Sequence, residues 1–381
     1  MRRFAVTLSA AVISACSSPR PAAAPISETP SLKDAFAGSF LVGAALNPAQ
    51  FTEKDRRGAA LVKAQFNTVT PENVLKWERV HPRRGEFDFK PADQYVAFAE
   101  RNGMFVVGHT LVWHQQTPRW VFEDANGNRV SRDTLLARLR DHIHTVVGRY
   151  RGRVKGWDVV NEAVDEDGTL RKTPWLAIIG EDYVAKAFEF AHEADPQAEL
   201  YYNDYSVENA PKRNGVVALI RKLQAQGIRV TAVGLQGHNK MDWPSVAQQD
   251  STISTIAALG VKVMITELDI DVLPRVTPSQ GADVSLNAAP AASLNPYTAG
   301  LPDSVQQALA KRYAELFAVY LKHRDAITRV TFWGVADGDS WLNGWPVRGR
   351  TSYPLLFDRA GRPKPAFWAV IRAAGQPIVS R

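Results

Sequence analysis

Two glutamates in this chain of 381 residues could carry acid–base chemistry. Glu162 ends the mostly apolar run 157–161, and Glu267 ends the run 264–266. Hydrolysis of a glycosidic bond needs two carboxyl groups on opposite sides of the anomeric carbon. One is protonated to help the leaving oxygen depart, and the other is ionised to attack the carbon or to activate water. Either glutamate alone is more simply explained as half of a salt bridge, so the hypothesis rests on the pair.

Polar residues also end other apolar runs of the chain. They are His109 after 106–108, Asn203 and Asp204 after 201–202, and Gln236 with His238 after 234–235. A carboxylate or imidazole is costly to bury at such a place unless it has a partner. Five such ends in one chain indicate one shared polar site.

The elements that must position these residues follow from the hydrophobic pattern. Short β-rich runs alternate with stretches of helical period from residue 40 onward, which favours βα repeats around a parallel sheet. We expect strands at 40–46, 66–70, 104–109, 155–161, 199–203, 230–236, 261–268 and 329–333. We expect helices near 52–65, 91–102, 131–149, 181–194, 212–227, 246–259, 304–323 and 363–374.

Eight strand–helix pairs predict an α/β fold, a (β/α)8 TIM barrel, as a single catalytic domain over residues 36–377. A doubly wound open sheet is the alternative, but it usually has fewer strands and a Gly-rich phosphate turn, which we do not find. In a barrel the active site lies at the C-terminal ends of the strands, where the polar residues are expected. The long segment 273–302 follows the seventh strand and should overhang that face.

The N-terminal residues have the pattern of an export signal. A basic start and a short apolar run predict a signal peptide over residues 1–16, and Ile13-Ser14-Ala15-Cys16 resembles a bacterial lipobox. Cleavage after Ala24, which would discard Cys16, is the alternative. Residues 17–35 are rich in Pro, Ala and Ser and are expected to be a flexible linker. We therefore expect a periplasmic or outer-membrane-anchored lipoprotein, or else a secreted protein.

Composition excludes several other classes. Cys16 is the only cysteine, so the chain has no internal disulfide. The net charge of +7 is spread among acidic residues rather than gathered in a stripe, which argues against nucleic acid as a partner. His142 and His144 are two apart on a predicted helix and do not share a face, so we expect no metal site and no cofactor. We expect a monomer whose contact with a membrane is limited to a lipid on Cys16.

Seven short motifs, in barrel order, resemble glycoside hydrolase family 10, the endo-β-1,4-xylanases. The two motifs that contribute most to the resemblance are Trp157-Asp-Val-Val-Asn-Glu162 and Ile265-Thr-Glu267-Leu-Asp269. The others are Thr70-Pro-Glu-Asn-Val-Leu-Lys-Trp77, Gly108-His-Thr-Leu-Val-Trp-His-Gln-Gln116, Asn203-Asp-Tyr205, Gly234-Leu-Gln-Gly-His238, and Phe332-Trp-Gly334 with Asp339-Ser-Trp341. The resemblance covers roughly residues 40–372.

The resemblance implies that Glu162 is the acid/base and Glu267 the nucleophile, with retention of anomeric configuration. It implies that His238 and Asp269 keep Glu267 ionised, with Asp269 behind His238. Residues that resemble the family's sugar contacts are Glu72, Asn73, Lys76, His109, Trp113, Gln116, Asn161, Asn203, Tyr205, Gln236, His238, Trp333 and Trp341. Asn161 would bind the 2-hydroxyl of the reacting sugar.

The implied substrates are xylan and xylo-oligosaccharides, since Trp333 and Trp341 stand where the family crowds out a C6 hydroxymethyl group. One such contact discriminates by only ~1 to 3 kcal/mol, so a β-1,4-glucanase or a mixed specificity stays open. A surface glycan-binding lipoprotein without activity is the alternative from another class. Two opposed carboxyls argue against it, because a binding protein has no need of them.

Overall fold

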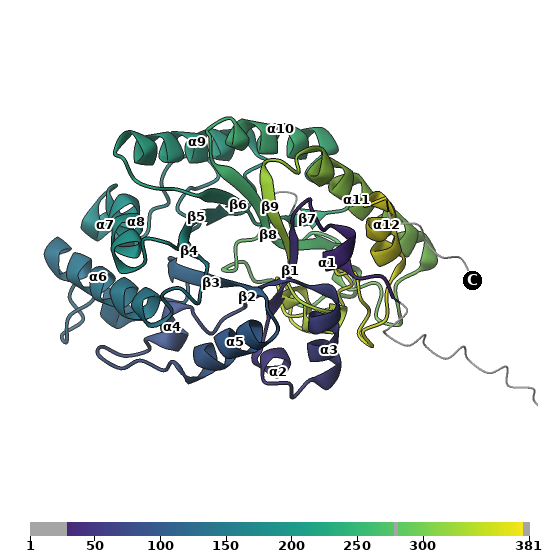
Figure 1. Ribbon diagram of the computed structural model, residues 1–381, viewed down its shortest axis with the longest axis horizontal. Coiled ribbons are helices and arrows are strands. Elements are labelled where there is room, and N and C mark those ends of the chain that lie inside the picture. Colours follow the sequence, from purple (N-terminus) through teal and green to yellow (C-terminus); the bar gives the residue numbers. More distant parts are fainter. Residues whose placement is uncertain (1–28, 278–280, 376–381) are drawn as a thin grey trace, which may run out of the picture.

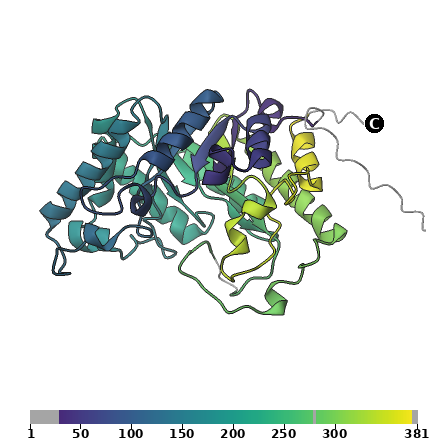
Figure 2. The same ribbon diagram turned by 90° about the horizontal axis from the view of Figure 1, so that it is seen from below.

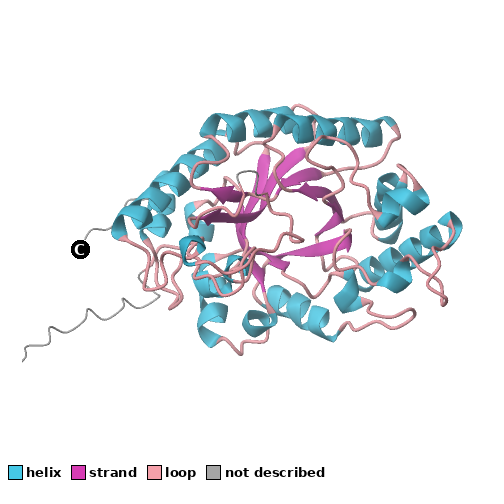
Figure 3. Cartoon of the chain, turned by 180° about the vertical axis from the view of Figure 1, so that it is seen from behind, coloured by secondary structure: helices cyan, strands magenta, loops and turns pink. Residues whose placement is uncertain are grey.

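Eight parallel strands close into a barrel in the computed structural model, which describes residues 29–277 and 281–375. The first strand pairs with the last, and the ring of strands lies inside a ring of helices (Figures 1 and 3). The strands of the barrel are β1 (Leu41–Leu46), β2 (Thr68–Pro71), β3 (Phe105–Val112), β4 (Gly156–Asn161), β5 (Glu199–Asp204), β6 (Ala232–Leu235), β8 (Lys262–Asp271) and β9 (Ile327–Phe332). The predicted TIM barrel is confirmed.

The helices cover the outside of this barrel. They are α1 (Leu32–Ala35), α2 (Pro48–Phe51), α3 (Arg56–Gln65), α4 (Trp77–Val80), α5 (Lys90–Arg101), α6 (Arg132–Arg149), α7 (Pro174–Ile179), α8 (Tyr183–Ala194), α9 (Ala210–Ala225), α10 (Val246–Ala257), α11 (Asp303–Lys322) and α12 (Pro365–Ala373). Short 3₁₀ turns are η2 (Arg119–Val121), η3 (Ala292–Leu294), η4 (Asp337–Asp339) and η5 (Trp341–Asn343). Ser131 caps α6 by accepting a hydrogen bond from the Thr134 amide, as expected of a serine at a helix start.

Several elements differ from the prediction. The expected helix at 52–65 corresponds to α3 alone, which begins at Arg56 after Asp55 caps it by accepting the Gly58 amide at 3.0 Å. The short helices α1, α2, α4 and α7 were not expected. A further strand, β7 (His238–Lys240), pairs with the outer half of β8. Because β7 supplies this second partner, β8 continues past the barrel rim to Asp271 rather than ending at 268.

The close approach of β3 and β4 depends on a glycine, Gly108, in the middle of β3. A Cβ added to Gly108 on β3 would lie 2.1 Å from Cε3 of Trp157 on β4, far inside contact distance. Trp157 is fully buried and fills the space that the missing side chain leaves. The glycine therefore allows a large aromatic side chain to pack directly beside β3, one residue before His109.

The folded part begins before the predicted boundary at residue 36. α1 lies inside the range 17–35 that we expected to be a linker, and its Leu32 is fully buried. The Leu32 amide donates to Oε1 of Gln65 at 2.9 Å. The predicted signal peptide, Cys16 and most of the linker lie outside the described residues. Among the helices of the described part, none has the length and apolar character needed to cross a membrane.

Candidate active site

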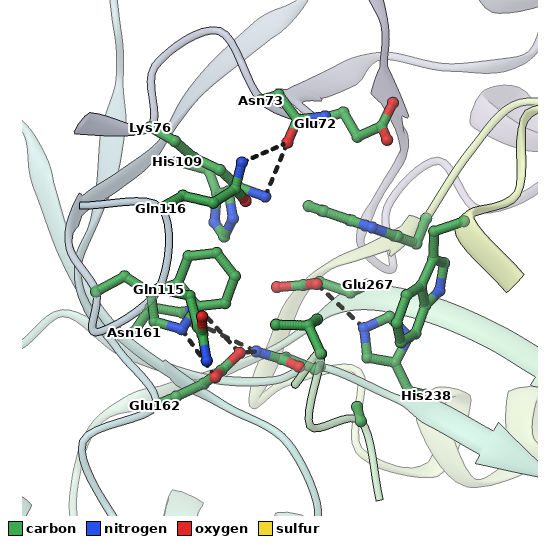
Figure 4. Close-up of a pocket in the computed structure, with 16 residues that line it drawn as sticks. Glu72, Asn73, Lys76, His109, Gln115, Gln116, Asn161, Glu162, His238 and Glu267 are labelled. Atoms are coloured by element: carbon green, nitrogen blue, oxygen red, sulfur yellow. Dashed lines mark hydrogen bonds and ion pairs between the residues drawn. The ribbon is translucent and has the colours of Figure 1, made fainter. Parts of the chain in front are cut away.

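A cavity of about 300 Å³ opens at the C-terminal ends of the barrel strands, where the sequence placed the site (Figure 4). It brings together thirteen of the predicted residues from distant parts of the chain. They are Glu72, Asn73, Lys76, His109, Trp113, Gln116, Asn161, Glu162, Gln236, His238, Glu267, Trp333 and Trp341. Two further predicted residues, Asn203 and Tyr205, are not among the residues that line it.

Glu162 directly follows β4 and is only 6% exposed. Its Oε2 accepts a hydrogen bond from Nε1 of Trp113 at 2.8 Å, and its Oε1 accepts one from Nε2 of Gln236 at 3.0 Å. Burial raises the pKa of Glu162 above its usual value, these two hydrogen bonds lower it in part, and the nearby charge of Glu267 raises it again. The result is a carboxyl group biased toward its protonated form.

Glu267 lies within β8, at the point where the partner strand changes from β6 to β7. Its Oε1 accepts a hydrogen bond from Nδ2 of Asn203 at 2.8 Å, and its Oε2 lies 3.1 Å from Nε2 of His238. Burial would raise the pKa of Glu267, but the hydrogen bond from His238 and nearby positive charges outweigh burial and lower it. Glu267 is therefore biased toward its ionised form.

His238 lies between two carboxylates. Its Nδ1 is 3.1 Å from Oδ2 of Asp269, which also accepts a hydrogen bond from Nε1 of Trp341 at 2.7 Å. Burial lowers the pKa of His238, but Asp269 and Glu267 outweigh it and raise the pKa to about 10. The imidazole is thus protonated at neutral pH and favours the ionised form of Glu267, in the arrangement expected from the sequence.

An amide network joins the two glutamates. The Oδ1 atom of Asn161 lies 2.9 Å from Nδ2 of Asn203 and 3.3 Å from Nε2 of Gln236. These two amide groups donate in turn to Glu267 and Glu162, respectively. The network fixes both carboxyl groups in one frame.

Asn203, which we expected to contact sugar, is not among the residues that line the cavity. Asn203 is fully buried on β5, and its Oδ1 accepts a hydrogen bond from Oγ1 of Thr266 at 2.6 Å. A Cβ at Gly234 would lie 2.3 Å from the same oxygen, so the glycine leaves the room that this amide occupies. Asn203 holds Glu267 from beneath instead of facing the cavity.

One wall of the cavity carries a lysine and two amides (Figure 4). Oδ1 of Asn73 accepts from Nζ of Lys76 at 3.1 Å and lies 3.4 Å from Nε2 of Gln116. The Lys76 ammonium lies 4.9 Å from the ring centre of Trp113. Burial lowers the pKa of Lys76, with a partial offset from nearby carboxylates, and burial raises the pKa of Glu72. This wall offers donors and acceptors of the kind that hydroxyl groups bind.

Aromatic rings form the facing wall. Trp333 follows β9, and its ring meets the imidazole of His109 edge to face, with centroids 5.4 Å apart. Trp341 stacks on Trp345 with centroids 4.4 Å apart, which fixes its orientation. His109 is itself held by Asp158, whose Oδ2 lies 2.9 Å from its Nδ1. Broad apolar faces of this kind suit the C–H faces of pyranose rings.

Tyr205, which we expected to contact sugar, is almost fully buried. Only 3% of Tyr205 is exposed, and Nζ of Lys212 lies 3.6 Å from its ring centre. On the loop side, a Cβ at Gly281 would lie 3.3 Å from its Cε2 atom. The ring is therefore covered by a buried lysine and by the loop 273–302.

Three residues that line the cavity were not predicted. Ala282 and Val284 belong to the loop 273–302, whose described part runs along the lower edge of the molecule in Figure 2. Because these two residues line the cavity, the expectation that this loop overhangs the catalytic face is confirmed. Gln115 directly precedes Gln116 in the motif after β3, and this neighbouring position could have marked it as a site residue. Nothing in the types of Ala282 and Val284 marks them as site residues.

Among the described residues, we find no cluster of three or more metal-ligating side chains.

Comparison with known proteins gives a consistent picture. The family model described as glycosyl hydrolase family 10 matches residues 31–373. Endo-1,4-beta-xylanase A of Xylanibacter ruminicola is 46% identical over 352 residues, which are 92% of this chain and 95% of that protein. The structure of an endoxylanase from a sugarcane soil metagenome has a TM-score of 0.87 at 47% identity, and the match covers 90% of this chain and 99% of that one.

Two further similar structures are of mutants of one enzyme, an intracellular xylanase from Thermoanaerobacterium saccharolyticum JW/SL-YS485. One is a complex of a glutamate-to-alanine mutant with xylotetraose, at a TM-score of 0.79. The other is a complex of a different glutamate-to-alanine mutant with xylotriose, at 0.78. Each is 35% identical to this chain and covers 90% of it and 98% of its own chain.

Proposed function

Because the chain belongs to glycosyl hydrolase family 10, we propose that it hydrolyses internal β-1,4-xylosidic bonds of xylan by double displacement, with Glu162 as acid/base and Glu267 as nucleophile. The observation that carries the proposal is the opposite bias of two buried carboxyls in one cavity. The two glutamates mutated in the Thermoanaerobacterium enzyme support it further. They are separated by the same number of residues as Glu162 and Glu267.

In the first step, the ionised carboxylate of Glu267 attacks the anomeric carbon while the bond to the leaving oxygen breaks. Glu162 donates its proton to that oxygen, so the shortened chain leaves as a neutral alcohol. The positive charge of His238 and the hydrogen bond from the amide of Asn203 keep the carboxyl group of Glu267 ionised at neutral pH. The product of this step is a glycosyl ester on Glu267 and an ionised Glu162.

In the second step, Glu162 acts as a base. Formation of the ester removes the negative charge of Glu267, which had raised the pKa of Glu162, so the ionised form of Glu162 becomes easier to maintain. Glu162 then takes a proton from water, whose oxygen attacks the anomeric carbon and releases Glu267. Two inversions at one carbon give net retention.

Xylan as the substrate is supported by the curated relatives and by the aromatic wall of Trp333 and Trp341. Hydroxyl groups of the sugar would bind to the wall of Glu72, Asn73 and Lys76, and the amide of Asn161 lies beside the proposed acid. A product profile on glucuronoxylan, arabinoxylan and carboxymethylcellulose tests the specificity. We expect xylo-oligosaccharides from the first two, and cellulose-derived products at a comparable rate would contradict it.

Substitution of the glutamates tests the mechanism. We expect Glu267→Ala and Glu162→Ala to lower kcat on xylan by at least about 10²- to 10⁴-fold, since each loses one essential group. Glu181→Ala is the matched control, because Glu181 is exposed and paired with Lys222 outside the cavity. NMR of the first product formed by the wild type should show the β anomer, and an α anomer would contradict double displacement.

We also propose that the chain is exported, as the N-terminal pattern suggests, and that it acts as a monomer. Radiolabelled palmitate should label the wild type in a bacterial host and not Cys16→Ala. Equal absence of label in both would favour ordinary cleavage after Ala24. Sedimentation should give the mass of one chain, and a dimer mass would contradict the monomer.

A further inference from the structure

The backbone of Glu162 adopts an unusual conformation. Its φ angle is 59°, in the left-handed region that residues other than glycine rarely occupy. Such a conformation persists only where the surroundings hold it. The Glu162 amide donates to the carbonyl oxygen of Asn203 at 2.8 Å, and its own carbonyl oxygen accepts from Nε of Arg171 at 3.1 Å. Both peptide groups of this residue are therefore fixed from outside the cavity.

The next two amides are held by one phenol. The amides of Ala163 and Val164 each donate to the hydroxyl oxygen of Tyr202 at 3.1 Å. The same hydroxyl donates to Oδ2 of Asp204, whose Oδ1 lies 3.0 Å from Nζ of Lys212. Tyr202, Asp204 and Lys212 are all fully buried. The buried ion pair thus fixes the phenol, and the phenol fixes the turn after Glu162.

Arg171 holds the same turn from its other side. Its own amide donates to the carbonyl oxygen of Ala163 at 2.8 Å. Its Nη2 lies 3.4 Å from the carbonyl oxygen of Val164 and 2.9 Å from the hydroxyl of Tyr205. The guanidinium therefore spans the carbonyls of Glu162 and Val164 at once. Neither Arg171 nor the Tyr202 cluster is among the residues that line the cavity.

We propose that Arg171 and the cluster of Tyr202, Asp204 and Lys212 are positioning residues, which hold the left-handed turn so that the Glu162 carboxyl faces the leaving-group oxygen. This inference rests on the proposed role of Glu162 as acid/base. Without the cluster, the backbone of Glu162 relaxes toward an ordinary φ, and its carboxyl group leaves the donors on Trp113 and Gln236. A displacement of about 1 Å can lower a rate on the order of 10²-fold.

Tyr202→Phe tests this, because it removes only the hydroxyl that accepts the two amides. The readout is kcat/KM on two aryl β-xylobiosides, which covers the steps up to the glycosyl ester. Phenol needs a proton to leave, whereas 2,4-dinitrophenol leaves without one. We expect kcat/KM to fall at least about tenfold on the phenyl substrate and less than about threefold on the dinitrophenyl substrate. A loss of fold alone would lower both equally.

Tyr95→Phe is the matched control. The hydroxyl of Tyr95 is also buried and donates to two backbone carbonyls, of Val69 at 2.7 Å and of Val107 at 2.9 Å, away from Glu162. We expect this variant to leave the ratio of the two kcat/KM values unchanged. In a Tyr202→Phe variant whose circular dichroism spectrum and melting curve show it to be folded, equal losses on both substrates, or no loss on either, would overturn the proposal.

Arg171→Lys provides a second variant that does not depend on the buried phenol. It keeps the positive charge but loses the planar edge that reaches several acceptors, and we expect the same split between substrates. If Tyr202→Phe does not fold, this variant decides. Glu162→Ala separates the two levels of inference: if it shows no split, the acid/base role fails. If it shows one and Arg171→Lys does not, the positioning role alone is overturned.

Discussion

The protonated imidazole between Glu267 and Asp269 couples the chemistry of the site to the stability of the fold. His238 is buried, and each of its two carboxylate partners lies 3.1 Å away. In the unfolded chain these partners are lost and the pKa returns to its usual value. The residue therefore contributes free energy of folding that depends on pH.

The direction of that dependence follows from the raised pKa. Because folding raises the pKa of His238 from 6.5 to about 10, its contribution is complete below about pH 6.5 and is lost as the pH rises toward 10. Each pH unit in this window is worth up to about 1.4 kcal/mol. Urea denaturation of the wild type from pH 6 to 10 should show this decline, and His238→Gln should show a flatter one. An identical decline in both proteins contradicts the prediction.

Trp113 should set the alkaline limit of activity. Its Nε1 donates to Oε2 of Glu162 at 2.8 Å and lowers the pKa of that carboxyl. Trp113→Phe removes this donor, so the pKa of Glu162 rises and the protonated acid persists to higher pH. We expect the alkaline limb of kcat/KM on xylotetraose to move to higher pH.

A second tryptophan provides the control for that shift. Nε1 of Trp120 donates to the carbonyl oxygen of Pro82 at 3.1 Å, and Trp120 is not among the residues that line the cavity. Trp120→Phe should leave the alkaline limb in place. A limb that stays put or moves down in Trp113→Phe would show that this hydrogen bond does not control Glu162.

At the level of elements, the contact between β3 and β4 depends on Gly108. A Cβ there would overlap the buried ring of Trp157, so Gly108→Ala should destabilise the protein by about 1 to 3 kcal/mol. Gly148 on α6 is the matched control, because a Cβ at that position meets nothing within 4 Å. Gly148→Ala should stabilise by about 0.5 to 1 kcal/mol. Urea denaturation of both variants measures the difference, and equal values would contradict the argument.

The sequence predicts the barrel well because its strands are buried on both faces and are continuously apolar. It does not predict β7, since His238–Lys240 carries no apolar signal and pairs only with the outer half of β8. It also cannot tell which residues at the ends of strands face the cavity. Asn203 is buried because of Gly234 and Thr266, and Tyr205 is covered by a distant loop. Both depend on packing between segments that are remote in sequence.

At the scale of the whole molecule, Phe36 packs the N-terminal part of the fold against α11. Its ring stacks on Phe40 with centroids 5.0 Å apart and meets Phe317 of α11 at 5.2 Å. Phe36→Ala should lower the free energy of unfolding by about 3 to 5 kcal/mol through lost burial and a new cavity. Val246→Ala, at a side chain 40% exposed, should change it by less than about 0.5 kcal/mol. A small effect at Phe36 would show that its ring contributes little to the packing against α11.

The position of α1 at one end of the barrel also decides how the enzyme can be attached to a solid support. The Leu32 amide is hydrogen-bonded to Gln65, the last residue of α3. This contact lies beside the N-terminal ends of β1 and β2, at the end of the barrel opposite the cavity. A bead coupled to the thiol of a Thr29→Cys variant would hold the molecule at the N-terminal end of the barrel. The cavity would then face outward, toward xylan fibres that are too large to diffuse. Such a preparation should keep its activity on insoluble xylan, whereas coupling through Val284, at the wall of the cavity, should abolish it.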